Sequence, residues 1–294
     1  MADGLAARHA AGTIGALRRE LAAQLGAAGV PLPGEEARDV IAALLDVPRF
    51  WAVTHARDAA DSALREGALR AARRRAAGAP FAYAVGRSAF RHLTLDVDER
   101  VLIPRQETEL LPELVFARLG TAGGTAADVG TGSGAIALSL ASEGRFDRVI
   151  ATDVSLDALA VAGANVRQLA RALRAAVELR HGSALAPVAG ERVRAVVSNP
   201  PYIAYRELEA LPASVRDWEP ALALCCGGEG MDLTAQIVRD AAAVLESGGV
   251  LALEVDVRRA SLVAERAVSD GRYRDVAVRL DLTGRERFVV ATRV

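Results

Sequence analysis

The second half of the chain alternates short apolar segments with helical ones, and this alternation restricts the possible folds more than any other feature. After each of the first two apolar runs, apolar residues recur with helical spacing, so we expect one helix from Ser133 and another over residues 155–170. The expected strands are 126–129, 148–152, 177–180, 194–198, 250–255, 273–280 and 287–292. The pattern predicts an α/β fold with a mainly parallel, doubly wound sheet, whose ligand crevice lies at the carboxyl ends of the strands.

The first 80 residues have a different pattern. Apolar side chains recur there at three- and four-residue spacing in three segments, of which the first contains Ile14, Leu17, Leu21 and Leu25. Leu93, Leu95 and Val97 then alternate with polar residues, as in a half-buried hairpin. We therefore expect a helical N-terminal domain over residues 1–80, a β-hairpin linker over 81–108 and the α/β domain over 109–294.

Charge and cysteine content argue against several classes of protein. The chain has 36 basic and 37 acidic residues, a balance that argues against the nucleic-acid backbone as its main partner. Its two cysteines, Cys225 and Cys226, are adjacent, and its four histidines have no metal-ligand spacing. Since neither a secretory leader nor an apolar run of roughly 18 residues is present, we expect a cytoplasmic protein without membrane contact. From the cysteine and histidine positions we expect no metal, and from the charge balance no direct contact with nucleic acid.

A glycine-rich turn follows the first expected strand. The residues Asp128-Val129-Gly130-Thr131-Gly132-Ser133-Gly134 have GxGxG spacing rather than the GxGxxG spacing of dinucleotide-binding turns. The next strand ends at Asp153, where a carboxylate can accept hydrogen bonds from both hydroxyls of a ribose. Together the two features predict a ribose-bearing cofactor, either S-adenosylmethionine or a nicotinamide dinucleotide.

A second motif, Ser198-Asn199-Pro200-Pro201-Tyr202, decides between these cofactors. Two consecutive prolines end a strand and hold its backbone rigid. The Asn199 side-chain oxygen and the Pro200 carbonyl can accept the two hydrogens of a planar NH₂ group, and the Tyr202 ring can lie against its plane. Such a nitrogen is a poor nucleophile because its lone pair is delocalised, so orienting it toward a methyl sulfonium would promote methyl transfer. The motif therefore favours S-adenosylmethionine, with Asn199, Pro200 and Tyr202 as catalytic residues.

The two motifs resemble those of amino-methyltransferases, and their flanking segments are similar to one family, the peptide chain release factor glutamine methyltransferases, also called HemK or PrmC. The similar flanks are residues 81–86 with Phe90, residues 101–109 and residues 218–224. The resemblance implies a helical N-terminal domain, a β-hairpin linker and a seven-stranded methyltransferase domain. It also implies methyl transfer from S-adenosylmethionine to the side-chain amide nitrogen of the glutamine in the Gly-Gly-Gln motif of release factors.

The resemblance also assigns roles to individual residues. It implies that the cofactor is bound by Asp128, Gly130, Thr131, Gly132, Ser133, Gly134, Asp153, Ala184 and Asn199. The substrate amide would contact Asn199, Pro200, Pro201 and Tyr202. The chain departs from the usual family pattern at Gln106, at Ser183 and Ala184 near the adenine, and at Asp256 and Arg259.

Two other activities compete with this interpretation. An adenine amino group in DNA presents the same NH₂ chemistry to an Asn-Pro-Pro-Tyr loop, and another translation protein could carry the glutamine. The balanced charge and the short helical N-terminal segment argue against a DNA enzyme. Residues 57–91 contain eight arginines and three acidic residues, which is typical of a solvated helix face or of a docking surface for an acidic partner. We expect this segment to contact the body of a release factor.

Overall fold

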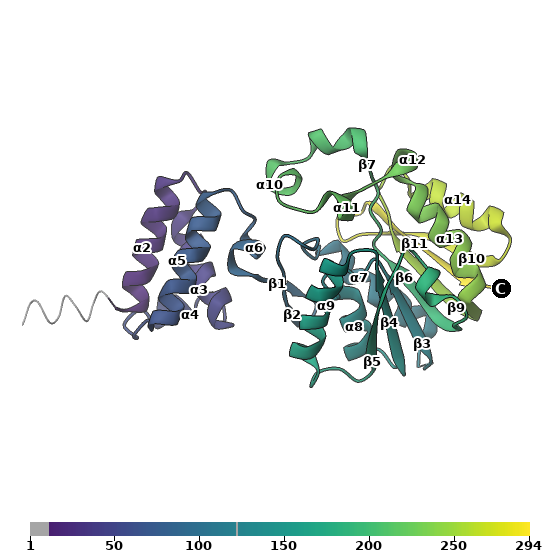
Figure 1. The fold of residues 1–294 in the computed structure, drawn as a ribbon, viewed down its shortest axis with the longest axis horizontal. Coiled ribbons are helices and arrows are strands. Elements are labelled where there is room, and N and C mark those ends of the chain that lie inside the picture. Colours follow the sequence, from purple (N-terminus) through teal and green to yellow (C-terminus); the bar gives the residue numbers. More distant parts are fainter. Residues whose placement is uncertain (1–11, 122) are drawn as a thin grey trace, which may run out of the picture. The chain divides into compact units, whose positions relative to one another are not determined.

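The computed structural model describes residues 12–121 and 123–294, and the chain divides into two compact units between Arg87 and Ser88 (Figure 1). The helical domain expected over residues 1–80 includes residues 1–11, which lie outside the described residues. No helix in the described ranges combines the length and the apolar character that crossing a bilayer requires.

The first unit is a bundle of helices. Its elements are α2 (Ile14–Ala27), α3 (Pro33–Leu45), α4 (Trp51–Thr54), α5 (Ser62–Ala76) and α6 (Phe81–Val85). The side chain of Thr13 caps α2 by accepting from the Ala16 amide at 3.2 Å, and Asp61 caps α5 by accepting from the Leu64 amide at 2.7 Å. The apolar positions named for the first predicted segment, Ile14, Leu17, Leu21 and Leu25, all belong to the core that these helices share.

The second unit is built on a seven-stranded sheet. Its strands are β3 (Thr125–Val129), β4 (Arg148–Asp153), β5 (Ala176–His181), β6 (Val193–Ser198), β9 (Leu245–Glu254), β10 (Tyr273–Leu280) and β11 (Glu286–Arg293). Their order is β10-β11-β9-β6-β3-β4-β5, in which β11 is antiparallel to both of its neighbours and the other pairs are parallel. The predicted α/β fold is confirmed. Each expected strand lies within an observed one or coincides with it, except that the expected strand 250–255 extends one residue past the end of β9.

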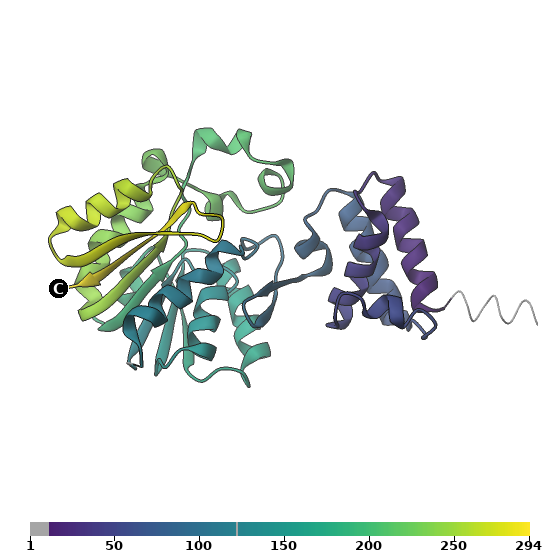
Figure 2. The same ribbon diagram turned by 180° about the vertical axis from the view of Figure 1, so that it is seen from behind.

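Helices cover both faces of this sheet, which is why its central strands are apolar along almost their whole length. On one face are α7 (Leu110–Leu119), α8 (Ala135–Glu143) and α9 (Leu156–Leu169). On the other are α13 (Asp232–Val244) and α14 (Ala260–Asp270), as Figure 2 shows from behind.

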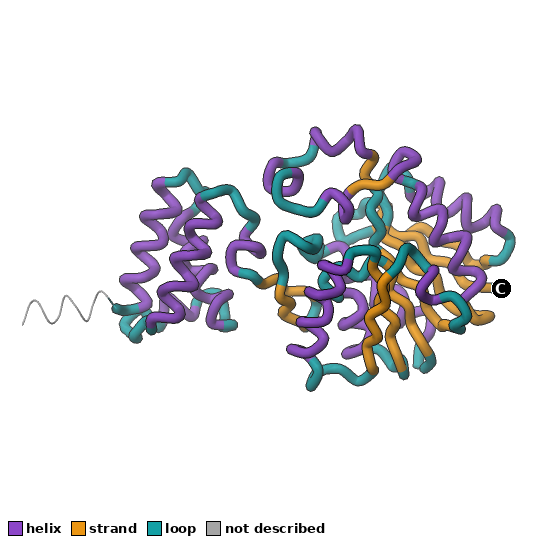
Figure 3. Tube along the Cα trace, in the orientation of Figure 1, coloured by secondary structure: helices purple, strands orange, loops and turns teal. Residues whose placement is uncertain are grey.

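The segment between β6 and α13 contains short helices and strands that the sequence did not predict (Figure 3). It contains β7 (Ile203–Ala204), the 3₁₀ helix η3 (Tyr205–Ala210), α10 (Ala213–Arg216), α11 (Ala221–Leu224), β8 (Cys225–Cys226) and α12 (Gly227–Gly230). Strand β7 pairs in parallel with β8, so the two cysteines lie beside the chain that follows the Asn-Pro-Pro-Tyr motif. Burial raises the pKa of both thiols, which disfavours the nucleophilic thiolate.

A buried asparagine fastens the expected hairpin and the glycine-rich turn to α9. The hairpin consists of β1 (Arg87–Phe90) and β2 (Leu93–Asp96). Asn165, on α9, is fully buried; its Oδ1 accepts from the Asp96 amide at 2.8 Å. Its Nδ2 donates to the Asp96 carbonyl at 3.0 Å and to the Ser133 carbonyl at 2.9 Å. One carboxamide therefore ties together three segments that are distant in the sequence.

Replacing Asn165 by alanine is expected to lower the free energy of unfolding by about 1–3 kcal/mol, because it leaves backbone groups of the half-buried Asp96 and the buried Ser133 without these partners. Urea denaturation followed by circular dichroism measures this change. Gln168→Ala is the matched control, since Gln168 is an exposed carboxamide on the same helix. Equal stabilities for the two variants would contradict the fastening role.

Candidate active site

Strands β9, β6, β3 and β4 end at one edge of the sheet, and the predicted site residues other than Ala184 lie at or directly after the ends of β6, β3 and β4. Ser198 is in register with Leu253 on β9 and with Val129 on β3, and Val129 is in register with Thr152 on β4. The Ser198 hydroxyl also donates to the Val129 carbonyl at 2.6 Å. The glycine-rich turn therefore lies between Asp153 on one side and the Asn-Pro-Pro-Tyr motif on the other, at the edge where parallel sheets bind ligands.

The glycine-rich turn has the shape of a cradle. Gly130, Gly132 and Gly134 have φ values of +72°, +56° and +88°, which residues with a side chain rarely adopt. A Cβ added to Gly130 or Gly132 would meet no atom within 4 Å, whereas one added to Gly134 would lie 3.2 Å from Leu138 Cδ1. Gly130 and Gly132 thus border open space, so a ligand can approach the backbone of the turn closely.

Asp128 and Thr131 brace this turn from within the protein. Asp128 Oδ2 accepts from the Thr131 hydroxyl at 2.7 Å and from the Ala137 amide at 3.0 Å. Asp128 is fully buried, and burial raises the pKa of its carboxyl to about 7. Its Oδ1 has no hydrogen-bond partner in the described part of the chain. Ser133 is also buried, so these three side chains shape the turn, and its glycines supply the open surface.

Asp153 holds the other side of the turn and keeps free acceptor capacity. Its Oδ2 accepts from the Gly132 amide and its Oδ1 from the Ser155 amide, both at 2.9 Å. Because each carboxylate oxygen has two lone-pair sites, each can accept one more hydrogen bond. That capacity matches the two adjacent hydroxyls of a ribose. The open glycines and this carboxylate together fit S-adenosylmethionine.

The structure gives Ala184 a position that the sequence did not reveal. Its methyl group belongs to the hydrophobic core, with only 7% of the residue exposed, and its carbonyl accepts from the Thr152 hydroxyl at 3.2 Å. Val154, directly after Asp153, is instead 49% exposed. The exposed apolar surface beside the proposed ribose position thus comes from Val154.

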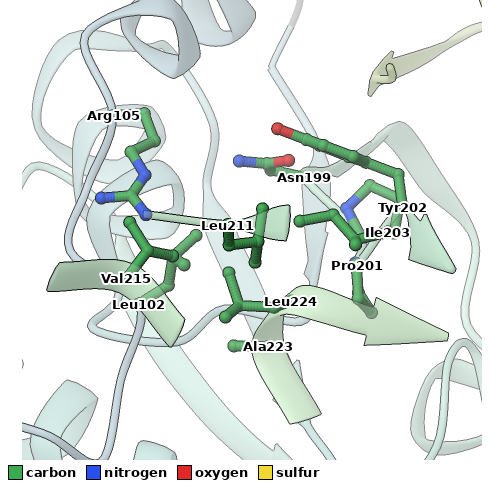
Figure 4. A pocket seen from close by; sticks show the side chains of 11 residues that line it. Leu102, Arg105, Asn199, Pro201, Tyr202, Ile203, Leu211, Val215, Ala223 and Leu224 are labelled. Carbon is green, nitrogen blue, oxygen red and sulfur yellow. The ribbon is translucent and has the colours of Figure 1, made fainter. Parts of the chain in front are cut away.

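The Asn-Pro-Pro-Tyr motif lines a pocket of about 200 Å³ (Figure 4). The other lining residues are Leu102, Arg105, Ile203, Leu211, Val215, Ala223 and Leu224. The pocket is therefore mostly apolar, and its polar side-chain groups are the Arg105 guanidinium, the Asn199 carboxamide and the Tyr202 hydroxyl. Arg105 is held by Glu219, whose buried carboxylate accepts from Arg105 Nη2 at 2.6 Å and from the Ile103 amide at 3.2 Å.

A hydrogen-bonded chain leads from the pocket into the protein. Asn199 Nδ2 donates to the Thr108 hydroxyl at 3.1 Å, and that hydroxyl donates to Glu254 Oε2 at 2.6 Å. Asn199 Oδ1 accepts no hydrogen bond from the described residues, so it is available to a ligand.

Burial raises the pKa of the Tyr202 hydroxyl to about 12, so Tyr202 stays neutral near pH 7.

Sequence reasoning missed Thr108, Glu254, Arg105 and Glu219 as parts of the site. Each stands in a segment that carried the family resemblance or at a strand end, but none was given a role. The signal for Glu254 was available: it ends a buried strand of the sheet, as Asp153 does. Thr108 lies in the 3₁₀ helix η1 (Glu107–Glu109), outside the sheet, and nothing local in the sequence marks it.

Comparisons with known proteins agree with the geometry. Residues 16–86 match the family model described as the PrmC N-terminal domain, and residues 90–213 match the methyltransferase small domain. The chain is 43% identical to a protein of Moorella thermoacetica named release factor glutamine methyltransferase, over 93% of this chain and 96% of that protein. A protein of the same name from Cereibacter sphaeroides is 39% identical over 91% of this chain and 94% of that protein.

Solved structures share the fold at lower identity. The hMettl16 catalytic domain, in complex with the MAT2A 3'UTR hairpin 1, has a TM-score of 0.55 at 18% identity and covers 79% of this chain and 81% of its own. A methyltransferase from Pyrococcus furiosus has a TM-score of 0.51 at 18% identity, covering 69% of this chain and 90% of its own. On the full-length similarity to its curated relatives, the chain belongs to the release factor glutamine methyltransferase family.

Proposed function

We propose that the protein methylates the side-chain amide nitrogen of the glutamine in the Gly-Gly-Gln loop of a peptide chain release factor, using S-adenosylmethionine. The observation that carries this proposal is that Asn199 Oδ1, in a mostly apolar pocket at the strand ends, accepts no hydrogen bond from the described residues. The relatives' names supply the class of substrate and do not favour a DNA adenine methyltransferase.

The cofactor would be held by the glycine-rich turn and Asp153. Gly130 and Gly132 leave room for it above the turn, and the Asp153 carboxylate would accept from its ribose hydroxyls. When bound, S-adenosylmethionine supplies a methyl group attached to a positively charged sulfur. The predicted contact from Ala184 would be made by its backbone, since its methyl group is buried.

Asn199 and Pro200 would orient the substrate amide. Asn199 Oδ1 and the Pro200 carbonyl accept one N–H each, which directs the nitrogen lone pair out of the amide plane toward the methyl group. Tyr202 packs beside the amide, and its neutral hydroxyl takes no part as a base. The nitrogen becomes acidic only as the new bond forms, so its proton can leave to water.

The apolar pocket suits a small flexible loop. Leu102, Leu211 and Val215 form walls without hydrogen-bonding side chains, so a segment of glycines can enter where larger residues would clash. Arg105 is directed by its bond to the buried Glu219 and can donate to backbone carbonyls of the loop.

The test is methylation of a purified release factor. Mass spectrometry after incubation with S-adenosylmethionine should find one methyl group on the glutamine of the Gly-Gly-Gln motif. A factor with glutamate at that position lacks the NH₂ group and serves as the matched control, and duplex DNA tests the adenine alternative. An unmodified glutamine, in a factor that a known release factor methyltransferase does modify, would defeat the proposal.

We further propose that the helical unit docks on the body of the factor through Arg57 and Arg73. The structure divides the arginine-rich segment: Arg65 pairs with Glu20, Arg70 with Glu66 and Arg75 with Glu36, while Arg91 of the second unit pairs with Glu143. Arg57 and Arg73 are exposed and have no ion pair with any described residue. Their charge is therefore available to an acidic surface.

Reversing both charges (Arg57→Glu with Arg73→Glu) should lower kcat/KM on the whole factor roughly tenfold, because electrostatic attraction accelerates association. Turnover of an excised Gly-Gly-Gln peptide should be unaffected. The control, Arg266→Glu with Arg279→Glu, reverses two exposed arginines of the second unit that have no ion pair in the described structure. Equal kcat/KM values for the two double variants would exclude docking through Arg57 and Arg73.

A further inference from the structure

Three polar groups from separate elements meet behind the pocket. Asn199 follows β6, Thr108 lies in η1, and Glu254 ends β9. The Asn199 Nδ2 to Thr108 Oγ1 distance is 3.1 Å, and the Thr108 Oγ1 to Glu254 Oε2 distance is 2.6 Å. Thr108 and Glu254 are 4% and 1% exposed, so water does not compete for these bonds. The proposed chemistry of methyl transfer uses Asn199 but gives Thr108 and Glu254 no role.

The chain of bonds has a direction, because a hydroxyl has only one hydrogen. An ionised carboxylate is an acceptor only, so Thr108 must donate to Glu254. Thr108 can then only accept on its other side, and the group that Asn199 turns toward it must be the NH₂ group. Asn199 Oδ1 consequently points away from Thr108. If the Asn199 carboxamide were rotated by half a turn, its NH₂ group would face the N–H donors of the substrate amide, and no hydrogen bond could form.

We propose that Glu254 and Thr108 are positioning residues that fix the orientation of the Asn199 carboxamide, so that its oxygen accepts from the substrate amide. The proposal rests on the function proposed above for Asn199. It assigns a task to a buried carboxylate that would otherwise be an unfavourable group in the interior.

Protonation of Glu254 reverses the chain of bonds. The protonated carboxyl can donate to Thr108, whose hydrogen then turns to Asn199 and favours the reversed carboxamide. Arg287 on β11 and Arg105 favour the charged carboxylate, whereas Glu107 and, above all, burial disfavour it and raise its pKa to about 7. The neutral Tyr202 is also close enough to interact with Glu254 electrostatically. Lowering the pH through this pKa should therefore lower kcat.

Thr108→Val and Thr108→Ser separate positioning from packing. Valine keeps the shape of threonine without the hydroxyl, and it should lower kcat about tenfold to a hundredfold, the effect of misorienting a reacting group. The affinity for S-adenosylmethionine should change little. Serine retains the hydroxyl and should restore most of the kcat that valine loses. Equal losses for valine and serine, or no loss for valine, would overturn the proposal.

The pH profile of kcat adds a readout that a packing defect would not change. The fall in kcat below about pH 7 should be present in the wild type and absent in Thr108→Val, because the link to Glu254 is broken. The pKa of Asp128 is also about 7, but any effect of Asp128 would persist in Thr108→Val. A low-pH fall that survives in Thr108→Val would therefore count against the role of Glu254.

A measurement without substrate distinguishes this proposal from the proposed function. The ¹⁵N-edited NMR signals of the Asn199 NH₂ group, assigned by their loss in Asn199→Asp, should shift with a midpoint near pH 7 in the wild type. They should not shift in Thr108→Val or in Glu254→Gln. If the wild type does not methylate a release factor, the proposed function is wrong, but this titration still tests the positioning role. Asn199 NH₂ signals that do not respond to pH in the wild type would overturn the positioning role of Glu254 and Thr108.

Discussion

Asn199→Ala is expected to lower kcat by about a hundredfold or more, while any cofactor contact of Asn199 contributes so little that the affinity for S-adenosylmethionine stays nearly unchanged. The Asn199 carboxamide oxygen lines the pocket and accepts no hydrogen bond from the described residues, and Thr108 holds the carboxamide in place. Removing one preorganised polar contact to a reacting group typically lowers kcat by about 10²–10³-fold. Steady-state kinetics on a purified release factor give kcat, and calorimetric titration gives the cofactor affinity.

Gln106→Ala is the matched control for Asn199→Ala. Gln106 is an exposed carboxamide shortly before Thr108, so its removal deletes the same chemical group without touching the pocket. Its kcat should stay within a few-fold of the wild type. If Asn199→Ala also retained activity within a few-fold, Asn199 would not orient the substrate amide.

Asp153→Ala is expected to weaken S-adenosylmethionine binding by about 1.5–3 kcal/mol, the range for hydrogen bonds to a charged group. By the relation of about 1.4 kcal/mol per tenfold, the dissociation constant should rise by one to two orders of magnitude. The structure gives two reasons for this loss of affinity. The carboxylate would accept from the ribose, and it already holds the Gly132 amide and thereby the shape of the turn.

Asp153→Asn and Asp157→Ala are the informative comparisons. Asparagine keeps one acceptor oxygen and should lose less affinity than alanine, while Asp157 is exposed in the first turn of α9 and should matter little. Calorimetry with S-adenosylmethionine and with NAD completes the test, since the GxGxG turn predicts tighter binding of the former. No measurable change in Asp153→Ala would remove Asp153 from the cofactor site.

The sequence alone predicted the parts of the site that are encoded locally. Gly130, Gly132 and Gly134 mark a turn because backbone conformations with positive φ favour glycine. The prolines after Asn199 end a strand wherever they occur, and alternating strands and helices place the ends of parallel strands at one edge. Fold class, the glycine-rich turn and the Asn-Pro-Pro-Tyr loop could therefore be predicted without knowing which residues meet in space.

The tertiary structure alone decided which distant residues support these motifs. The hydroxyl of Thr108 meets Glu254 across 146 positions of sequence, and Asn165 meets the Asp96 backbone across 69. These contacts depend on the order of the strands and on where η1 and α9 pack, and no periodicity or spacing encodes either. The same holds for the methyl group of Ala184, which is in the core because of how its segment packs. Local backbone preferences act between chain neighbours, whereas side-chain hydrogen bonds and burial depend on distances that only the folded chain sets.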